Sequence, residues 1–307
     1  MQIKFVLEFS YYYSNGGETM IIGELGNNWF QAYKKCLESF QVMDAIRIAY
    51  YYRPKKLYKY YSFDDYWKDN VQRGTIVFNS VNNFNDPLDS RWFLDYEKIL
   101  KNRMKDIGSS TDIVDELLTY NGKKRYTLLE EDMLYLYDFF RISCFSETPC
   151  SNVMWGHYAD KHKGFCIEYD VDKLTESLKP LMPVVYTDKP FDASDIIDMR
   201  GIDDKYAIFC PALFKSKDWS YEKEWRIMMP QCENEIKLYH VPGAITGVYL
   251  GFKTLSGETA TVADELEDIA NELNIPVYRM ERSYLSYDLI YSSISDLKSG
   301  NSEGFLI

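Results

Sequence analysis

The stretch WSYEKEWRIMMP at residues 219–230 carries the most informative pattern in the chain. Charged side chains at Glu222, Glu224 and Arg226 alternate with apolar ones from Trp225 onward. A period of two predicts a half-buried β-strand, with both carboxylates and the guanidinium on one face and Trp225 toward the core. The pattern therefore predicts a rigid strand that holds a glutamate pair beside a cation.

Two carboxylates in this arrangement have a chemical use. They can polarise a sugar hydroxyl or stabilise an oxocarbenium-like centre, while the adjacent guanidinium keeps one of them ionised and the pKa of the other is raised. The same spacing also fits an exposed strand face that carries a surface ion pair. Spacing alone leaves both interpretations open.

The same periodicities assign the rest of the chain to an α+β fold. Residues 1–55 are predicted as an N-terminal adjunct of strands plus one helix, which runs from about residue 28 to 51. Residues 91–140 are predicted as an insert of two helices in a core that spans 56–285, and 286–307 as a polar tail. The predicted core strands are 57–61, 75–81, 141–147, 163–170, 182–186, 245–252 and 275–281, and the predicted core helices are 64–72, 152–162 and 260–274.

Charge and composition restrict the partners and the compartment. The 307 residues include 35 Lys and Arg against 47 Asp and Glu, which gives a formal net charge of −12. Such a surface repels phosphate backbones and acidic lipid as a whole, so a nucleic-acid partner needs a local basic patch. No apolar run approaches the length of a membrane-spanning helix, and six cysteines are too sparse for a disulfide scaffold. These features predict a cytoplasmic protein without a membrane partner.

A second candidate cluster is FNDP at residues 84–87, just after a predicted strand and Ser80. Pro87 stiffens this loop, and Asn85 and Asp86 can hydrogen-bond the backbone, so a simple turn explains the residues. The alternative is that Ser80 points into a cleft and that Asn85 and Asp86 belong to a ligand site.

The third cluster is MWGHY at residues 154–158. Its helix either presents aromatic side chains to a cleft or packs Trp155 in the core. His157 and His162 are five residues apart, which is not the spacing by which one helix face offers two imidazoles to a metal. A zinc site that adds the nearby cysteines lacks a CxxC pair, so no metal is expected.

Several catalytic motifs are missing from the sequence. It contains no GxGxxG turn after a strand, no P-loop, no GxSxG elbow and no HExxH helix. Hydride transfer on a Rossmann fold, P-loop hydrolysis and zinc proteolysis therefore lose support.

Six motifs in a fixed order carry a family resemblance. They are LYKYYS (57–62), VFNSVNNFNDP (77–87), ISCFSE (142–147), MWGHYADKHKGFCIEY (154–169), WSYEKEWR (219–226) and VYLG (248–251). With these motifs the chain resembles, from about residue 57 to 279, the bacterial and phage domain of unknown function family 2971. That family looks like a distant relative of the ADP-ribosyltransferase fold, which implies a split, mainly antiparallel sheet with NAD in a cleft.

The resemblance implies roles for particular residues, by order along the chain. The His or Arg of the first core strand in such enzymes falls on Lys59, a departure that weakens the usual grip on the diphosphate. The catalytic glutamate falls on Glu224, with Glu222 and Arg226 beside it. The residues implied to bind NAD, as substrate, are Tyr58, Lys59, Tyr60, Ser80, Asn85, Asp86, Trp155, His157 and Tyr158.

The implied function is an NAD-dependent ADP-ribosyltransferase or NAD glycohydrolase. It would move ADP-ribose to a macromolecular acceptor, a protein or a nucleic acid, in phage defence or as a toxin with an antitoxin or immunity partner. Two alternatives stay open. One is a non-enzymatic ligand-binding module on the same fold. The other is a metal-dependent hydrolase or nuclease that uses Asp86, His157, Glu222 and Glu224.

Overall fold

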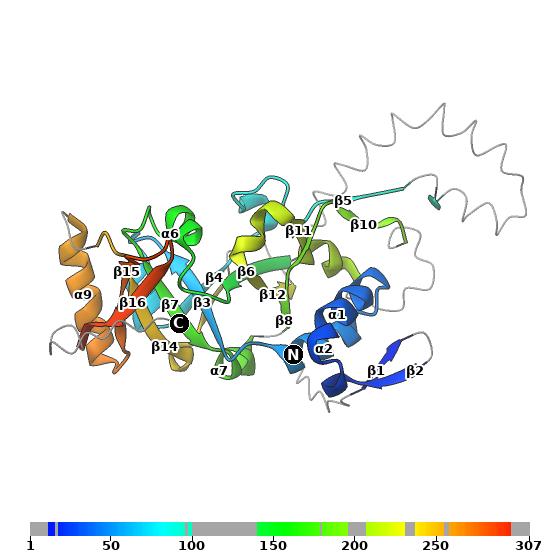
Figure 1. Ribbon diagram of the computed structural model, residues 1–307, viewed down its shortest axis with the longest axis horizontal. Coiled ribbons are helices and arrows are strands. Elements are labelled where there is room, and N and C mark those ends of the chain that lie inside the picture. Colours follow the sequence, from blue (N-terminus) through cyan, green and yellow to red (C-terminus); the bar gives the residue numbers. More distant parts are fainter. Residues whose placement is uncertain are drawn as a thin grey trace, which may run out of the picture. The chain divides into compact units, whose positions relative to one another are not determined.

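The computed structural model divides into two units, each assembled from separate stretches of the chain (Figure 1). Unit 1 contains Met1–Arg53, Phe84–Phe139 and Val185–Lys217, and unit 2 contains Pro54–Asn83, Phe140–Val184 and Asp218–Ile307. The structure describes residues 12–15, 18–95, 98–99, 140–178, 180–195, 207–230, 237–254 and 258–295.

An eight-stranded mixed sheet forms the centre of unit 2, in the order β16-β15-β14-β7-β3-β6-β12-β8. All neighbours are antiparallel except β14 and β15, so the predicted α+β class with a mainly antiparallel sheet is confirmed. The strands are β3 (Lys56–Tyr61), β6 (Phe140–Ser146), β7 (Phe165–Asp170), β8 (Leu181–Pro183), β12 (Glu224–Pro230), β14 (Ile245–Leu250), β15 (Val277–Arg282) and β16 (Leu289–Ser293).

The two faces of this sheet follow from the register, because directly opposite residues of antiparallel strands share a face. Tyr58 lies opposite both Glu168 and Ser146, and Ser146 lies opposite Glu224. Helix α6 (Asn152–Tyr158) packs on this side of the sheet through Trp155, so we call this side the α6 face. The alternate residues point to the other side, the α3 face.

The α3 face is covered by aromatic packing. Phe165 of β7 contacts Trp67 of α3 (Trp67–Gln72), at 6.4 Å between ring centroids, and stacks with Tyr61 at 5.3 Å. Helix α9 (Glu258–Glu272) contacts α3 and β15. The remaining elements of unit 2 are α7 (Val171–Ser177), the strand pair β4 (Thr75–Phe78) and β13 (Lys237–His240), and the 3-10 segments η3 (Val81–Asn83) and η7 (Pro242–Ala244).

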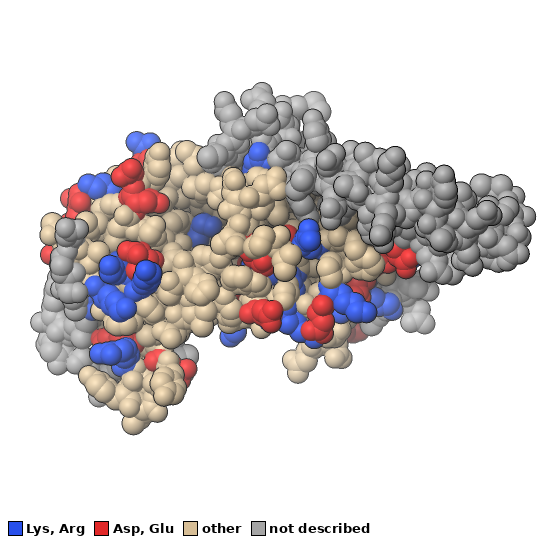
Figure 2. Space-filling model, turned by 90° about the horizontal axis from the view of Figure 1, so that it is seen from above, with Lys and Arg blue, Asp and Glu red and all other residues tan. Residues whose placement is uncertain are grey.

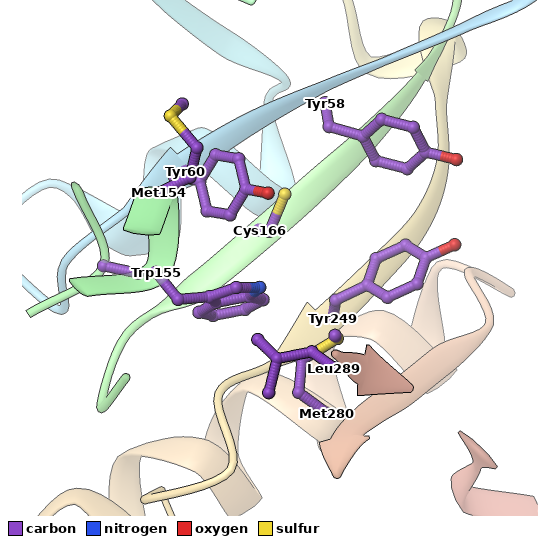
Figure 3. Close-up of a cluster of buried hydrophobic side chains, with 9 residues drawn as sticks. Tyr58, Tyr60, Met154, Trp155, Cys166, Tyr249, Met280 and Leu289 are labelled. Carbon is purple, nitrogen blue, oxygen red and sulfur yellow. The ribbon is translucent and has the colours of Figure 1, made fainter. Parts of the chain in front are cut away.

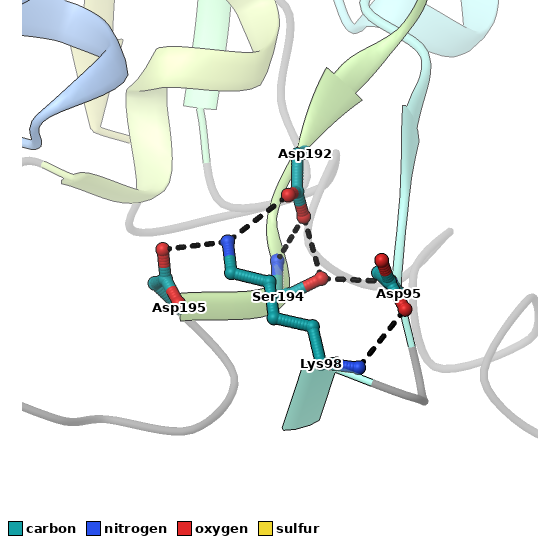
Figure 4. A network of polar contacts seen from close by, with 5 residues as sticks. All are labelled: Asp95, Lys98, Asp192, Ser194 and Asp195. Carbon is teal, nitrogen blue, oxygen red and sulfur yellow. Dashed lines mark hydrogen bonds and ion pairs between the residues drawn. The ribbon is translucent and has the colours of Figure 1, made fainter. Parts of the chain in front are cut away.

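Unit 1 is built from short elements. They are β1 (Tyr12–Asn15), β2 (Glu18–Ile21), η1 (Ile22–Glu24), η2 (Gly26–Asn28), α1 (Trp29–Glu38), α2 (Val42–Tyr52), β5 (Trp92–Phe93), β9 (Val185–Thr187), β10 (Phe191–Asp192), η5 (Ala207–Leu213) and β11 (Phe214–Ser216). Lys98 joins this unit's segments through its ammonium, which donates to Asp192 at 3.1 Å and to Asp195 at 2.9 Å, while the Ser194 hydroxyl accepts from the main chain of Asp95 (Figure 4).

The single helix predicted over 28–51 is wrong, because the structure has two helices, α1 and α2. Phe40 adopts a left-handed φ of 57°, and two hydrogen bonds close the end of α1: Gln41 N to Cys36 O at 2.8 Å and Phe40 N to Leu37 O at 3.1 Å. This is a Schellman motif, in which glycine is usual at the left-handed position. The break therefore carried no glycine signal in the sequence.

Two other segments differ from the sequence predictions. Of the predicted helical insert at 91–140, residues 92–93 form strand β5 instead, and residues 96–97 and 100–139 lie outside the described residues. The predicted polar tail at 286–307 contains β16, which pairs with β15 over five residues, from Tyr278↔Ser293 to Arg282↔Leu289. The described helices include none that is long and apolar enough to cross a membrane.

Candidate functional site

The candidate site lies on the α6 face of unit 2, where β12 begins. The predicted strand over 219–230 starts only at Glu224, because residues 217–222 form the 3-10 segment η6 (Lys217–Glu222). Lys223 has a left-handed φ of 45° and separates the two elements. Glu222 therefore reaches the site from a turn and not from the strand, although it is buried, at 3% exposure.

Glu224 and Arg226 form a buried ion pair. Arg226 Nε donates to Glu224 Oε1 at 2.8 Å, and Arg226 Nη2 donates to Oε2 at 3.1 Å. The two residues are two apart on one strand, so they share a face as the sequence predicted. Their side chains are 5% and 0% exposed, which contradicts the alternative of an exposed strand face with a surface ion pair. Trp225 points to the α3 face and is buried, as predicted.

Glu222 is held by groups from two other elements. Tyr158 of α6 donates its hydroxyl to Glu222 Oε1 at 2.6 Å, and Ser146 of β6 donates its hydroxyl to the main-chain oxygen of Glu222 at 2.7 Å. Helix α6 is fixed at its start by Ser151, whose hydroxyl accepts from the Met154 N–H. The helix ends at Tyr158 and not at residue 162, because residues 160–162 all have positive φ values.

Tyr158, which contacts this glutamate, belongs to a group of partly exposed aromatic side chains. His157 is exposed, and Tyr158, Trp219 and Tyr221 are half-buried. The His157 ring lies 6.1 Å from Trp219 and 6.2 Å from Tyr221, and Trp219 lies 5.9 Å from Tyr221. Trp219 and Tyr221 were not among the predicted site residues, although both stand inside the WSYEKEWR motif. We call His157, Tyr158, Trp219 and Tyr221 the aromatic group.

Tyr58, Tyr60 and Trp155 occupy the core next to the site (Figure 3). Trp155 is fully buried and donates its indole N–H to the main-chain oxygen of Pro149 at 2.6 Å, which confirms the core-packing alternative for this residue. Tyr60 packs edge-on against Trp155 at 5.3 Å and donates to the main-chain oxygen of Thr148. The polar atoms of these side chains are thus already satisfied within unit 2.

Glu168 is a buried carboxylate that the sequence analysis missed. Its side chain is buried, at 2% exposure, and its carboxylate accepts hydrogen bonds from Tyr58 (3.1 Å), Tyr249 (2.8 Å) and Thr246 (2.8 Å). It also forms an ion pair with Lys56 at 2.8 Å. Burial raises the pKa of this carboxyl, but these donors outweigh burial, so its pKa lies below the ordinary value. Burial and the neighbouring carboxylate raise the pKa of both tyrosines. The alternation of KGFCIEYD gave no sign of these partners, which come from β3 and β14.

Lys59 points to the opposite face of the sheet from the glutamates, although the charge of Glu224 still acts on its ammonium. Its ammonium donates to the hydroxyl of Ser143 at 3.1 Å and to the main-chain oxygen of Cys144 at 2.9 Å, and it lies 5.2 Å from the centre of the Phe145 ring. Phe145 pairs with Trp225, so the side chain of Lys59 is on the α3 face. Burial lowers the pKa of this ammonium. The residues of β3 that point to the α6 face are Tyr58 and Tyr60.

The remaining predicted site residues are Ser80, Asn85 and Asp86. Ser80 is buried and its hydroxyl accepts from Asn82 N, next to the bridge between Asn79 and Ile142. That end of β6 is four residues, about 13 Å, from Ser146. Asn85 and Asp86 belong to unit 1, where Asp86 Oδ1 accepts from Leu88 N at 2.8 Å, so the predicted turn is confirmed. The second oxygen of Asp86 is buried without a hydrogen-bond partner among the described residues.

The charged side chains and the possible metal ligands add little to this description of the site. In the view of Figure 2, Lys and Arg side chains lie next to Asp and Glu side chains in small groups. Within the part of the chain that the structure describes, no group of three or more His, Cys, Asp or Glu side chains is placed to hold a metal ion.

What the site offers chemically is therefore a pair of buried carboxylates with different partners beside partly exposed aromatic rings. The comparison with curated proteins gave no significant match, and neither did the comparison with solved structures. One family model matches, and its span runs from α6 into β12, so it includes the aromatic group, Glu168, Glu222 and the Glu224–Arg226 pair. Residues 154–227 match the family described as Protein of unknown function (DUF2971), which is the family that the sequence motifs resemble.

Proposed function

We propose that unit 2 binds NAD on the α6 face and cleaves its nicotinamide–ribose bond, as an ADP-ribosyltransferase or NAD glycohydrolase. The observation that carries the proposal is that Glu222 and Glu224, two residues apart in the chain, are both buried carboxylates, and that Glu222 is hydrogen-bonded to Tyr158 of the aromatic group. A sugar-cation reaction needs fixed negative charge at the reacting carbon and a flat surface for the leaving group. The proposal also rests on the resemblance of the motifs to a family that looks like the ADP-ribosyltransferase fold.

The proposed step breaks the bond between C1′ of the nicotinamide ribose and the ring nitrogen of nicotinamide. Both electrons of that bond leave with the ring, so nicotinamide departs as a neutral molecule and the ribose becomes an oxocarbenium-like cation. An acceptor hydroxyl, amine or ring nitrogen then forms the new bond at C1′ and loses a proton. With water as the acceptor, the product is free ADP-ribose.

Each residue has a role that its surroundings suit. Glu224 stabilises the developing cation, and Arg226 keeps it ionised and fixes its orientation through two parallel hydrogen bonds. Glu222 receives the proton of the acceptor, with Tyr158 as the group that positions it. Nicotinamide stacks on His157, Trp219 or Tyr221, since these rings are partly exposed while Tyr58, Tyr60 and Trp155 are buried.

The proposal uses only side chains on the α6 face of unit 2, so it assigns no role to Lys59, Asn85 or Asp86. Lys59 is directed to the α3 face, and Asn85 and Asp86 belong to unit 1. A macromolecular acceptor, a cytoplasmic location and a role in phage defence or toxicity with an immunity partner are part of the proposal only through the resemblance.

A non-enzymatic NAD- or nucleotide-binding module is the second candidate function. Its supporting observation is that both oxygens of Glu224 already accept hydrogen bonds from Arg226, an arrangement that also suits a purely structural pair. In this case the aromatic group would bind the ligand without any bond breaking.

Nicotinamide release and thermal shift with NAD distinguish the two functions. For the enzyme we expect NAD to raise the melting temperature and free nicotinamide to accumulate, because a ligand stabilises the state that binds it. Glu222→Gln and Glu224→Gln are expected to abolish release while keeping the thermal shift. The matched control is Glu147→Gln at the same end of β6, whose carboxylate accepts from the Trp225 indole at 2.6 Å.

The possible results of these two assays distinguish the enzyme from the binding module. A thermal shift without release, at NAD concentrations that saturate the shift, supports the binding module. Neither a shift nor release would overturn both functions. Release that persists in Glu224→Gln at the rate of the Glu147→Gln control would remove Glu224 from the reaction.

A further inference from the structure

Three basic side chains gather around one aromatic ring on the α6 face of unit 2. The His162 ring lies 4.7 Å from the centroid of the Phe252 ring, and the charged ends of Lys253 and Arg282 each lie 5.6 Å from that centroid. Phe252 packs against the buried side chains of Figure 3, and Arg282 lies opposite Leu289 of that group. We call His162, Phe252, Lys253 and Arg282 the Phe252 cluster.

Three segments that are distant in the sequence supply this cluster. His162 belongs to the loop between α6 and β7, Lys253 follows the end of β14, and Arg282 ends β15. Main-chain hydrogen bonds join the first two segments, from Lys253 N to His162 O at 3.1 Å and from Gly251 N to Gly164 O at 3.0 Å. A Cβ at Gly251 would stand 2.2 Å from His162 O, so these segments are in close contact. The backbone therefore holds the basic groups in place before any ligand binds, which lowers the entropy cost of binding.

The two cations of the cluster are not neutralised by a carboxylate. Within the part of the chain that the structure describes, neither Lys253 nor Arg282 forms an ion pair. Glu281 alternates with Arg282 to the other face of β15, and Asp288 accepts a hydrogen bond from a serine hydroxyl of its own hairpin at 2.7 Å. In a chain with a net charge of −12, two unpaired cations around one ring form a local positive field that attracts an anion.

His162 adds a hydrogen-bond donor beside these charges. The ring is half-buried, and its Nδ1 is buried without a hydrogen-bond partner among the described residues. Burial and the charge of Lys253 lower the pKa of the imidazole, so the ring is neutral and carries one proton at neutral pH. A buried N–H group without a partner is rarer than a buried acceptor without one. We therefore place the proton on Nε2, from which it can be donated to a ligand.

We propose that the Phe252 cluster binds the phosphate group of a small ligand, which is either a nucleotide or the free phosphate ion. Lys253 and Arg282 supply the opposite charge, the Arg282 guanidinium donates two parallel hydrogen bonds to phosphate oxygens, and His162 donates a third.

The position of the cluster in the sheet supports this assignment. Strands β14 and β15 are parallel and are joined by α9, and the cluster lies at the carboxyl ends of both strands. Ligands of sheets with parallel strands and connecting helices bind outside those ends. The inference does not depend on any reaction at Glu224, because it concerns binding at the other side of α6 from Glu222.

Imidazole NMR of the full chain tests the site directly, because the sequence contains three histidines. Inorganic phosphate, ADP and the uncharged nucleoside adenosine are titrated separately at neutral pH and constant ionic strength. We expect phosphate and ADP to shift the His162 resonance with a Kd below about 1 mM, the range of weak binding by small ligands. Adenosine is expected to leave this resonance unchanged, and His162→Gln identifies it by removing it from the spectrum.

Charge-neutralising variants test the two cations. Arg282→Gln and Lys253→Gln are each expected to weaken phosphate binding by about tenfold, the usual effect of losing one charge-assisted hydrogen bond. Arg282→Lys keeps the charge and is expected to lose less affinity than Arg282→Gln. Lys173→Gln is the matched control, because Lys173 is exposed on α7, at the opposite end of β7, and its loss changes the net charge equally. The resonance of His240, which contacts Thr75 at 3.0 Å, reports that each variant is folded.

The two phosphate-bearing probes distinguish the sources of the ligand. Tighter binding of ADP than of phosphate at His162 indicates a nucleotide, and equal affinities indicate the free ion.

Three results would overturn the proposal. One is a His162 resonance that does not move up to about 10 mM phosphate or ADP, where a site with a Kd of about 1 mM is about nine-tenths filled. Another is a Lys173→Gln variant that loses as much affinity as Arg282→Gln, since binding would then follow net charge. The third is tighter binding of a short single-stranded RNA than of ADP, which would assign the cluster to a polynucleotide.

Discussion

Arg226 holds Glu224 with two parallel hydrogen bonds, 2.8 and 3.1 Å long, in a place where neither side chain is more than 5% exposed. Both side chains are withdrawn from solvent, so their charges are compensated inside the protein, and each supplies part of that compensation to the other. Desolvation of such a pair costs several kcal/mol, about as much as the mutual attraction returns. The presence of the pair is therefore weak evidence for added stability, but removing one of its two partners lowers the free energy of unfolding.

We expect Glu224→Gln to lower the free energy of unfolding by about 3–5 kcal/mol, because it removes the charge of the carboxylate that the buried guanidinium of Arg226 contacts through two hydrogen bonds. Replacing both partners, as Glu224→Leu/Arg226→Met, is expected to recover most of the loss. Urea denaturation followed by tryptophan fluorescence measures both.

The Lys68–Glu265 pair, in which both side chains are 48% exposed, is the comparison. Lys68→Ala is expected to change the free energy of unfolding by less than about 1 kcal/mol. If Glu224→Gln cost no more than this, the pair would behave as a solvated one and the burial argument would fail.

A second prediction concerns the acid stability that comes from Glu168. Its pKa in the folded protein lies below the ordinary value of 4.5, since Lys56, Thr246 and Tyr249 stabilise the charged form against burial. A depressed pKa contributes stability that is complete above the ordinary pKa and is lost as the pH falls through the folded-state pKa. We expect Glu168→Gln to be destabilised at pH 7, and its deficit to shrink as the pH falls below about 4.5.

Urea denaturation of the two proteins between neutral and acid pH provides the measurement. Glu147→Gln, which changes an exposed carboxylate just after β6, is the control and should follow the wild type in parallel. A deficit of Glu168→Gln that stays constant through this pH range would show that its network owes nothing to the charge.

Two glycines around α6 should respond to alanine in opposite directions. A Cβ at Gly164 would stand 2.1 Å from the main-chain oxygen of Tyr61, so the backbone of β3 or β7 must move. A Cβ at Gly156, inside α6, meets nothing within 4 Å. We expect Gly164→Ala to destabilise by more than about 3 kcal/mol, and Gly156→Ala to stabilise by about 0.5–1 kcal/mol through helix propensity. Thermal unfolding of both variants checks the signs, and a neutral Gly164→Ala would contradict the close approach of the two strands.

Most of the sheet in unit 2 could be predicted from periodicity because its strands are buried or alternate clearly. The strands 57–61, 141–147, 163–170, 245–252 and 275–281 correspond to β3, β6, β7, β14 and β15. Prediction failed where the backbone takes a left-handed conformation at a residue other than glycine. Phe40 ends α1 and Lys223 delays β12 in this way, and neither position carries a turn residue that marks it.

Only part of the candidate site could be predicted, because alternation shows which residues of one strand share a face but not which strands lie beside it. Alternation places Glu224 and Arg226 on one face, and the structure confirms it. Alternation within YKY also puts Lys59 on the opposite side from its neighbours, but choosing which of the three residues faces the glutamates requires the pairing of β3 with β6 and β7. The partners of Glu168 are likewise set by long-range pairing, which one sequence does not reveal.

The hydrogen bond from Tyr158 to Glu222 gives a prediction that joins stability to function. Tyr158→Phe keeps the ring and removes the 2.6 Å contact, so it is expected to lower the free energy of unfolding by about 1.5–3 kcal/mol, the usual contribution of a hydrogen bond to a charged group. If Glu222 takes the acceptor proton, its orientation matters to the rate, and nicotinamide release should fall by about 10–100-fold. The thermal shift with NAD should persist, since the stacking rings are intact.

Tyr61→Phe separates positioning from stability. It removes the contact between the hydroxyls of Tyr61 and Tyr169, which are 3.1 Å apart on the α3 face, and keeps its ring stacked on Phe165. We expect a loss of stability of about 0.5–1.5 kcal/mol with unchanged nicotinamide release, because this face is remote from the glutamates. Equal losses of release in the two variants would mean that the rate follows stability, and Tyr158 would then have no positioning role.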